Sequence, residues 1–176
     1  LQYLTPVPSP SLGEGNKRGV VTRFISVRDW NEAGTVDRIL SELQNTDVAM
    51  VSDAGTPLIS DPGFKIVRAA KAAGFTVVPI PGASAVIAAL SAAGLPTNKF
   101  VFLGFLPKKW DLYPGMTNII YESPIRSDKT LNLIRTRYPD AQIVVARELT
   151  KLYEYIGPDD GKNDKGEVTL LAYLPE

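Results

Sequence analysis

The stretch VSDAGTPLISDPG, residues 51–63, decides the fold of this chain. It continues the apolar run DVAM at 47–50, and together they predict a strand that is buried on both faces. Gly55 then marks a turn where a ligand can approach the backbone, because small residues leave room there. Asp61 and Pro62 are typical of the N-cap and the first residue of a helix. A strand, an open turn and a helix in this order predict an α/β fold whose ligands bind beyond the C-terminal ends of the strands.

Elements of the same kind flank this stretch. A short strand at 24–27 and an amphipathic helix are predicted before it. After it, a helix that ends at Gly74 leads to the predicted strand TVVPIP at 76–81 and to a mostly apolar helix at 83–93. Alternating strands and helices predict a mostly parallel first sheet. The inward positions are Val36, Ile39, Leu40 and Leu43 in the first helix, and Phe64, Val67 and Ala70 in the second.

The pattern changes after residues 96–99. The runs FVFLGF, NIIYES, IVVARE and VTLLAYL predict four strands, with one helix between Pro124 and Tyr138, and so indicate a second lobe with a mixed sheet. This division assigns residues 21–96 to an N-terminal α/β lobe and 97–176 to a C-terminal α/β lobe. Residues 1–20, rich in Pro, Ser and Gly, predict a disordered or extended leader.

Composition excludes several classes of function. The 176 residues include neither cysteine nor histidine, so disulfides, thiolate nucleophiles, histidine bases and typical zinc sites are excluded. Acid–base chemistry therefore depends on Asp, Glu, Lys, Tyr or water. Nineteen basic and nineteen acidic residues cancel, so no global field attracts nucleic acid, although a local basic patch still can. The chain has no apolar run long enough for a membrane span and no signal-peptide pattern, which predicts a cytoplasmic protein without membrane contact.

The order of several motifs carries a specific resemblance. The runs VSDAGTPLISDPG, PGASAVIAALSAAGLP, GFLPK, YESPIR, ARELTK and KGE resemble the bacterial 16S ribosomal RNA cytidine-2'-O-methyltransferase family, which belongs to the tetrapyrrole-methylase superfamily. The first two runs are highly diagnostic. The resemblance implies a two-lobed fold and an enzyme that depends on S-adenosylmethionine (AdoMet). It also implies that the substrate is a cytidine of small-subunit ribosomal RNA, that no metal is used and that the protein is a homodimer.

The same resemblance implies a cofactor cleft between the two lobes. Backbone contacts with AdoMet are expected from Gly55, Thr56 and Ile59. Ser84 and Ala85 would hold its polar end, and the free N–H groups of a helix N-terminus suit that role, although Ser84 is as well explained as a plain N-cap. The expected contacts with the adenosine are Tyr121, Glu122, Ala146 and Leu149.

Methyl transfer to a ribose hydroxyl needs positioning and a group that takes the proton. By the resemblance Asp61 is the first candidate for this base and Asp53 the second, while a role of Asp61 as N-cap is also physically sufficient. Contacts with RNA are expected from Lys108, Lys109, Arg126 and Arg147, and Trp110 and Tyr113 are suited to base stacking. Solvated surface charge and simple packing are the ordinary alternatives for these side chains.

The chain departs from the family pattern in several places. A strand with a TPIGNL-like loop and an EDTR segment are absent before residue 21, and the helical segment that usually follows GFLPK is missing. Trp30 and Ile125 stand where the family usually has histidine. These losses favour, as an alternative, a degenerate paralogue that retains AdoMet binding or dimerisation without turnover. A tetrapyrrole methylase and a nucleic-acid-binding module without chemistry are two further alternatives.

Overall fold

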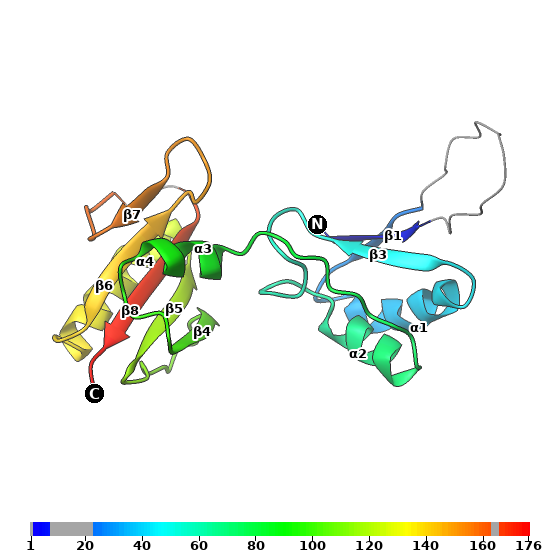
Figure 1. Cartoon of the computed structure of the whole chain (residues 1–176), viewed down its shortest axis with the longest axis horizontal. Helices are drawn as coiled ribbons and strands as arrows, with labels where there is room; N and C mark the ends of the chain where they lie inside the picture. The colour runs from blue at the N-terminus through cyan, green and yellow to red at the C-terminus, as the bar shows by residue number, and fades with distance from the viewer. Residues whose placement is uncertain (1, 8–22, 163–165) are drawn as a thin grey trace. The chain divides into compact units, whose positions relative to one another are not determined.

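The computed structural model describes residues 2–7, 23–162 and 166–176, and the chain forms two compact units. Unit 1 is Leu1–Ala83 and unit 2 is Ser84–Glu176, and each contains a sheet of its own (Figure 1). The boundary precedes the helix α3 (Ala85–Ala92). This helix therefore belongs to unit 2, whereas the sequence assigned residues up to 96 to the first lobe.

Unit 1 is built on a three-stranded sheet in the order β2-β1-β3. The central strand β1 (Gln2–Val7) is antiparallel to both β2 (Ile25–Val27) and β3 (Asp47–Val51). The prediction of a mostly parallel first sheet is therefore wrong, because the expected leader supplies a central strand of opposite direction. The rest of that leader, residue 1 and residues 8–20, lies outside the described residues.

Unit 1 also contains the helices α1 (Glu32–Leu43) and α2 (Phe64–Ala72). Ile39 of α1 and Ile66 of α2 pack with Ile25 of β2 in the core of the unit.

Two details of unit 1 differ from the sequence-based expectation. Phe64 is 62% exposed, and Ile66 is buried in its place, beside Ala70, which was predicted to face inward. Residues 76–81 form no strand, and Val78 is exposed there. A physical reason is that Pro79 and Pro81 lack the N–H groups that a central strand needs.

Unit 2 is built on a five-stranded mixed sheet in the order β4-β5-β8-β6-β7. The neighbours β4 (Phe100–Phe105) and β5 (Met116–Glu122) are parallel, and the other neighbouring strands are antiparallel. The remaining strands are β6 (Gln142–Arg147), β7 (Tyr155–Gly157) and β8 (Val168–Leu174). Four of these strands form where the sequence predicts them, and β7 was not predicted.

Different helices cover the two faces of the unit 2 sheet (Figure 1). Ile119 and Leu171 pack on the face covered by α3, whereas Ile120 and Leu170 pack on the face covered by α4 (Pro124–Arg137). Successive residues of a strand point to opposite faces, so β5 and β8 are buried on both sides. Their continuous apolar sequences follow from this position.

Candidate functional site

The turn after β3 and the turn before α3 are joined by a hydrogen bond. Thr56 donates its hydroxyl to the carbonyl of Ala83 at 2.9 Å. Gly82 lies against the same hydroxyl, because a Cβ at this position would come within 3.1 Å of the Thr56 Oγ1. The stretches DAGTP and PGA, both predicted as ligand loops, thus lie side by side, and small residues are needed where they meet.

Backbone strain is concentrated in two loops. The unit 1 loop, residues 52–63, contains Leu58 and Ser60 with φ angles of 73° and 60°. The unit 2 loop, residues 148–154, contains Glu148 and Thr150 with φ angles of 47° and 64°. No other non-glycine residue in the described part of the chain has a positive φ. Such conformations cost on the order of 1–3 kcal/mol each and cluster at functional sites.

A glutamate from a different helix binds the N-terminus of α2. Glu32 is 6% exposed, and its Oε1 accepts hydrogen bonds from the N–H groups of Gly63 at 3.0 Å and Lys65 at 2.7 Å. Gly63 permits this geometry with a φ of 130°, and a Cβ there would come within 2.7 Å of the Met50 sulfur. Asp61 is not the N-cap, because that position is Gly63, so this prediction is wrong.

Asp61 therefore does not cap α2. It is half-buried, and no hydrogen bond or ion pair joins its side chain to another residue that the structure describes. Asp53, the second candidate base, is exposed near the start of the same loop. Sequence reasoning missed Glu32, although its position in the motif RDWNE, at the start of an amphipathic helix, was a visible signal.

The N-terminus of α3 has unfilled hydrogen-bonding capacity. Ser84 occupies the N-cap position with extended backbone angles, φ −145° and ψ 117°, but its hydroxyl makes no capping hydrogen bond. The carbonyl of Ser84 accepts from the N–H of Ala88 at 2.9 Å, so the N–H groups of the preceding turn, including that of Ala85, have no partner within the helix. An anionic group can accept hydrogen bonds at this end.

Three of the residues expected near adenosine lie on the α3 face of unit 2. Tyr121 and Leu149 are partly buried there and Ala146 is fully buried, all in the cluster that includes α3. Tyr121 is held by edge contacts with Phe102 and Phe105, at ring-centroid distances of 4.7 and 6.0 Å. The structure thus brings these three residues together as an apolar wall.

The side chain of Glu122 is used elsewhere. Its carboxylate accepts hydrogen bonds from the Ser123 N–H and the Thr130 hydroxyl, both at 2.8 Å, and pairs with Arg126 at 2.7 Å. These contacts fix the start of α4, so the structure assigns the Glu122 carboxylate a structural role. Arg126, predicted to bind RNA, is half-exposed and already carries this ion pair.

Arg147, also predicted to bind RNA, is an internal residue. It is 8% exposed and its guanidinium pairs with Asp160 at 2.9 Å. Burial alone would raise the pKa of Asp160, but hydrogen bonds from Arg147 and from the Lys162 backbone hold this pKa below its ordinary value. Contact of Arg147 with phosphate would require this ion pair to break.

The motifs ARELTK and KGE meet at the unit 2 loop. Glu148 Oε1 accepts hydrogen bonds from the Glu167 N–H at 3.0 Å and from Lys151 Nζ at 3.2 Å, and Lys151 also pairs with the Glu167 carboxylate at 2.9 Å. The backbone hydrogen bond and the ammonium group hold the pKa of Glu148 below its ordinary value. Hydrogen bonds to Glu167 and Glu148 raise the pKa of Lys151. Gly166, with a φ of 78°, leaves the room that the Glu148 carboxylate occupies.

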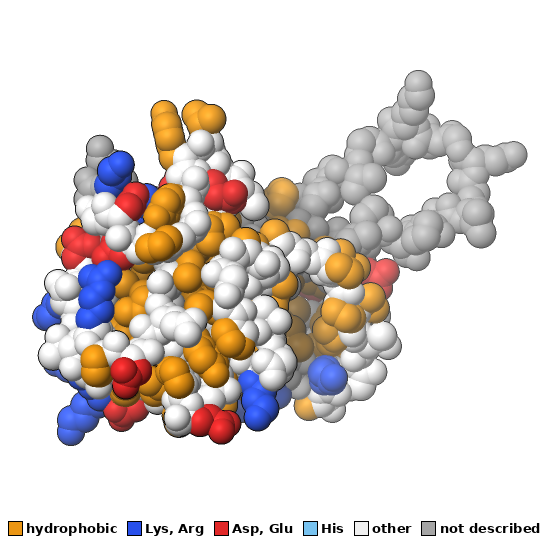
Figure 2. Space-filling model, turned by 60° about the vertical axis from the view of Figure 1, so that its left-hand side comes forward, with side chains coloured by type: hydrophobic (Ala, Val, Ile, Leu, Met, Phe, Trp, Pro, Cys, Tyr) orange, Lys and Arg blue, Asp and Glu red, His pale blue; other side chains and the backbone are white. Residues whose placement is uncertain are grey.

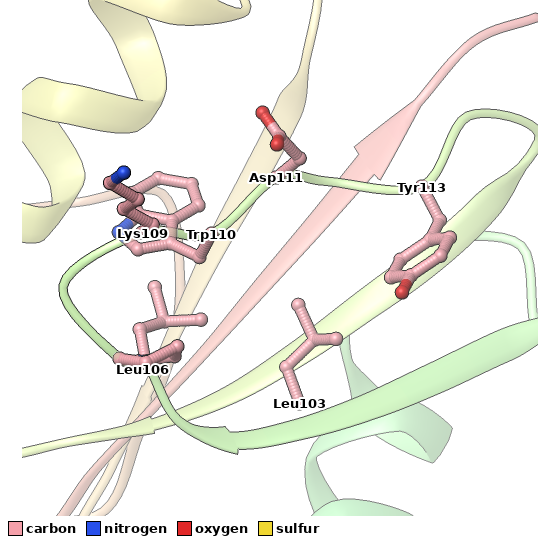
Figure 3. A pocket seen from close by; sticks show the side chains of 7 residues that line it. Leu103, Leu106, Lys109, Trp110, Asp111 and Tyr113 are labelled. Carbon is pink, nitrogen blue, oxygen red and sulfur yellow. The ribbon is translucent and has the colours of Figure 1, made fainter.

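A hollow of about 220 Å³ lies beside the connection from β4 to β5, residues 106–115. Trp110 and Tyr113 stand on opposite sides of the Leu103 side chain, and the Asp111 carboxylate is directed away from it (Figure 3). Lys109 also lines the hollow, and both Lys108 and Lys109 are exposed, with no ion pair to another described residue. In Figure 2, hydrophobic side chains gather in the centre of one face of unit 2, with charged side chains around them.

Two absences hold for residues 2–7, 23–162 and 166–176. Acidic side chains do not gather there in a group that could hold a metal ion. The helices in these ranges also lack the combination of length and apolar character that crossing a membrane requires.

The sequence of this chain matches a known protein family. Residues 8–160 match the family of Tetrapyrrole (Corrin/Porphyrin) Methylases, and the chain therefore belongs to that family.

Its relatives within that family carry a more specific name. The chain is 46% identical to the ribosomal RNA small subunit methyltransferase I of Pseudomonas aeruginosa, an alignment that covers 88% of this chain and 62% of the relative. It is 45% identical to the protein of the same name from Xylella fastidiosa, with 78% of this chain and 55% of the relative covered. The chain thus spans between half and two thirds of the length of these relatives. The Pseudomonas alignment is 176 positions long and yet uses 88% of the chain, so it contains gaps, in agreement with an internally shortened sequence.

Proposed function

We propose that this chain is an AdoMet-dependent methyltransferase that 2'-O-methylates a cytidine of small-subunit ribosomal RNA. Membership of the methylase family and the names of the relatives support methyl transfer to ribosomal RNA. The observation that carries the proposal is the position of the strain, because every described non-glycine residue with a positive φ lies in the DAGTPLIS or ARELTK motif. Strain of this kind persists only where surrounding contacts enforce it, and it is typical of residues held in place for binding.

The residues present fit AdoMet. In unit 1 a turn at Gly55 and Thr56 exposes backbone groups, and Ile59 is 48% exposed. In unit 2 the free N–H groups after Ser84 suit the carboxylate of the cofactor, and the apolar wall suits its adenine ring. When bound, AdoMet supplies an electrophilic methyl group on a sulfonium sulfur. The proposed contacts are Gly55, Thr56, Ile59, Ser84, Ala85, Tyr121, Ala146 and Leu149, with Glu122 contributing only its backbone.

Asp61 is proposed as the base that takes the proton of the ribose 2'-hydroxyl. Because Glu32 binds the N-terminus of α2, the Asp61 carboxylate is available for this step. A positioned base of this kind contributes about 10²- to 10⁴-fold to a rate. Asp53 remains the second candidate. Lys108 and Lys109 are proposed to contact RNA phosphates, since Arg126 and Arg147 already have carboxylate partners.

Calorimetric titration of the chain with AdoMet and with S-adenosylhomocysteine tests the cofactor site. Saturable binding is expected, and Ser84→Trp should abolish it by filling the space at the N-terminus of α3. Ser91→Trp, at an exposed position further along the same helix, is the matched control and should bind normally. The proposal fails if the native chain does not bind, or if both tryptophan variants bind equally well.

The substrate needs a separate assay. The family description also covers methylases of corrins and porphyrins, so transfer of labelled methyl groups is to be compared between small ribosomal subunits and a tetrapyrrole. Transfer to the ribosomal subunit alone supports the proposal, and transfer to the tetrapyrrole alone would replace it. AdoMet binding without transfer to either would identify a degenerate, inactive paralogue. The expected homodimer is tested by sedimentation of the same preparation.

A further inference from the structure

The connection from β4 to β5 is unusual in its length. These strands are parallel neighbours, yet residues 106–115 join them without a helix. Parallel neighbours usually need a crossover of about a dozen residues or more, most often a helix that covers the sheet. The short connection covers less of the sheet than a crossover helix would, and the hollow of about 220 Å³ lies beside it.

Buried side chains hold this connection in one conformation. Asn118, fully buried on β5, accepts a hydrogen bond from the Tyr113 N–H at 2.8 Å and donates to the Tyr113 carbonyl at 2.9 Å. The Tyr138 hydroxyl accepts from the Leu112 N–H at 3.0 Å, and Leu112 itself is 5% exposed. Side chains of β5 and α4 therefore hold the backbone of the connection in place. Its outer side chains are thereby held in fixed positions.

Arg137 of α4 fixes the outer part of the connection. Its guanidinium lies 4.7 Å from the centroid of the Trp110 ring, donates to the Trp110 carbonyl at 2.8 Å and pairs with Asp111. Two consequences follow for the hollow. The indole is held in position, and the negative charge of Asp111 is compensated by Arg137.

The hollow consequently presents two aromatic side chains and a net positive rim. Trp110 and Tyr113 flank the apolar side chain of Leu103 (Figure 3), and Tyr113 is 53% exposed. Next to them, Lys108 and Lys109 are exposed and form no ion pair with another residue that the structure describes. Flat rings stack on aromatic side chains, and the phosphates attached to nucleobases bind lysine.

We propose that this hollow binds one unstacked nucleobase of single-stranded RNA beside Trp110 and Tyr113, with Lys108 and Lys109 contacting the flanking phosphates. The choice of RNA as the ligand rests on the proposed function, but the site is separate from the residues assigned to AdoMet and to proton transfer. Because stacking on Trp110 and Tyr113 does not depend on the identity of the base, the hollow is expected to bind bases with little sequence preference.

Tryptophan fluorescence of the full chain tests this site. The chain has two tryptophans, Trp30 and Trp110, and Trp30 is 81% exposed in unit 1, so Trp30→Phe leaves Trp110 as the only reporter. This variant is titrated with a short oligouridylate and with an abasic ribose-phosphate oligomer of equal length. Saturable quenching by the oligouridylate is expected, together with much weaker binding of the abasic oligomer. Equal binding of the two oligomers, or no quenching, would overturn the proposal.

Three further variants separate stacking from charge. In the same background Tyr113→Ala should weaken oligouridylate binding by at least about fivefold, because stacking on one aromatic ring is removed. Tyr153→Ala removes a tyrosine that is 79% exposed in the unit 2 loop, and it should bind normally. Replacing both Lys108 and Lys109 by Ala should lower the slope of log affinity against log salt by about 0.7 for each phosphate that no longer binds a lysine. Equal effects of the two tyrosine variants, or an unchanged slope, would contradict the site.

The outcome is independent of the AdoMet titration. A chain that binds AdoMet but gives no base-dependent quenching retains the proposed function and loses this site. A chain that gives base-dependent quenching but does not bind AdoMet retains the site and loses the methyltransferase.

Discussion

The two strained loops are held by different kinds of contact. In the unit 1 loop, Thr56 bonds to the Ala83 carbonyl, and the loop ends at Gly63, whose N–H is bound by the buried carboxylate of Glu32. No cation among the described residues pairs with Glu32. In the unit 2 loop, Lys151 stands between the Glu148 and Glu167 carboxylates at a surface open to water.

This difference sets how each loop responds to its surroundings. Exposed ion pairs are screened by salt and contribute little to stability. A buried carboxylate is less affected by salt, and its removal leaves the N–H groups that it binds without an acceptor, which lowers stability. The unit 1 loop is therefore expected to keep its conformation as salt is added. The unit 2 loop is expected to loosen under the same conditions.

The largest effect is expected from Glu32→Ala. The buried N–H of Gly63 and the part-buried N–H of Lys65 lose their acceptor, and the free energy of unfolding of unit 1 should fall by about 3 kcal/mol. Urea unfolding followed by hydrogen exchange of peptides from α2 measures this loss. Asp37→Ala, an exposed acid on the same helix, is the matched control and should change little. Equal behaviour of the two variants would remove Glu32 from its assigned role.

A smaller effect is expected from Gly63→Ala. The new Cβ would lie 2.7 Å from the Met50 sulfur, and a φ of 130° is a backbone conformation that residues other than glycine adopt only with strain. The free energy of unfolding should therefore fall by about 2 kcal/mol. Gly34→Ala is the matched control, because α1 leaves open space at that position. Alanine there should raise stability by about 0.5–1 kcal/mol. Thermal unfolding of both variants measures the contrast, and a stable Gly63→Ala protein would contradict the described turn.

The mildest effect is expected from pH, in the unit 2 loop. The pKa of Glu148 lies below its ordinary value of 4.5, so its stabilising contribution is present above pH 4.5 and is lost as the pH falls through the lowered pKa. The pKa of Lys151 lies above 10.5, so its contribution is present below that pH and is lost as the pH rises through the raised pKa. Amide exchange of residues 148–154, corrected for intrinsic pH dependence, should accelerate at both extremes.

Lys151→Gln provides the control for that experiment. This variant should exchange faster at neutral pH and respond less to added salt, while exchange of residues 52–63 stays unchanged. Equal salt sensitivity of the two loops would show that the proposed difference between them does not exist.

The sequence predicted elements well where burial alone decides them. In unit 2, β5 and β8 have continuous apolar sequences because both faces of these strands are covered. The helix α4 begins at Pro124, as its sequence pattern indicates. Prediction failed where contacts with residues distant in the sequence determine the structure. The strand β1 comes from a segment with turn-like composition and forms by pairing with strands that lie far along the chain.

The candidate site shows the same limit. Its motifs were found from the sequence, but the contacts within them were not. A local pattern made Asp61 the natural cap of α2, whereas Glu32, 31 residues before Gly63, takes that place. The ion pair between Arg147 and Asp160, 13 residues apart, depends on packing that local spacing does not report, whereas Arg126 and Glu122 form an i,i+4 pair. Long-range hydrogen bonds of this kind are visible only in the folded chain.

Methyl transfer by Asp61→Asn is the most direct test of Asp61 as the base for the ribose 2'-hydroxyl. Transfer from labelled AdoMet to small ribosomal subunits is to be measured for the native chain, for this variant and for Asp53→Asn, with the free energy of unfolding measured in parallel. We expect transfer by the native chain and a rate at least about 100-fold lower for Asp61→Asn. Asp61→Asn should keep AdoMet affinity and stability, because Glu32 and not Asp61 binds the N-terminus of α2. Full activity of Asp61→Asn, or a loss of stability like that of Glu32→Ala, would contradict these expectations.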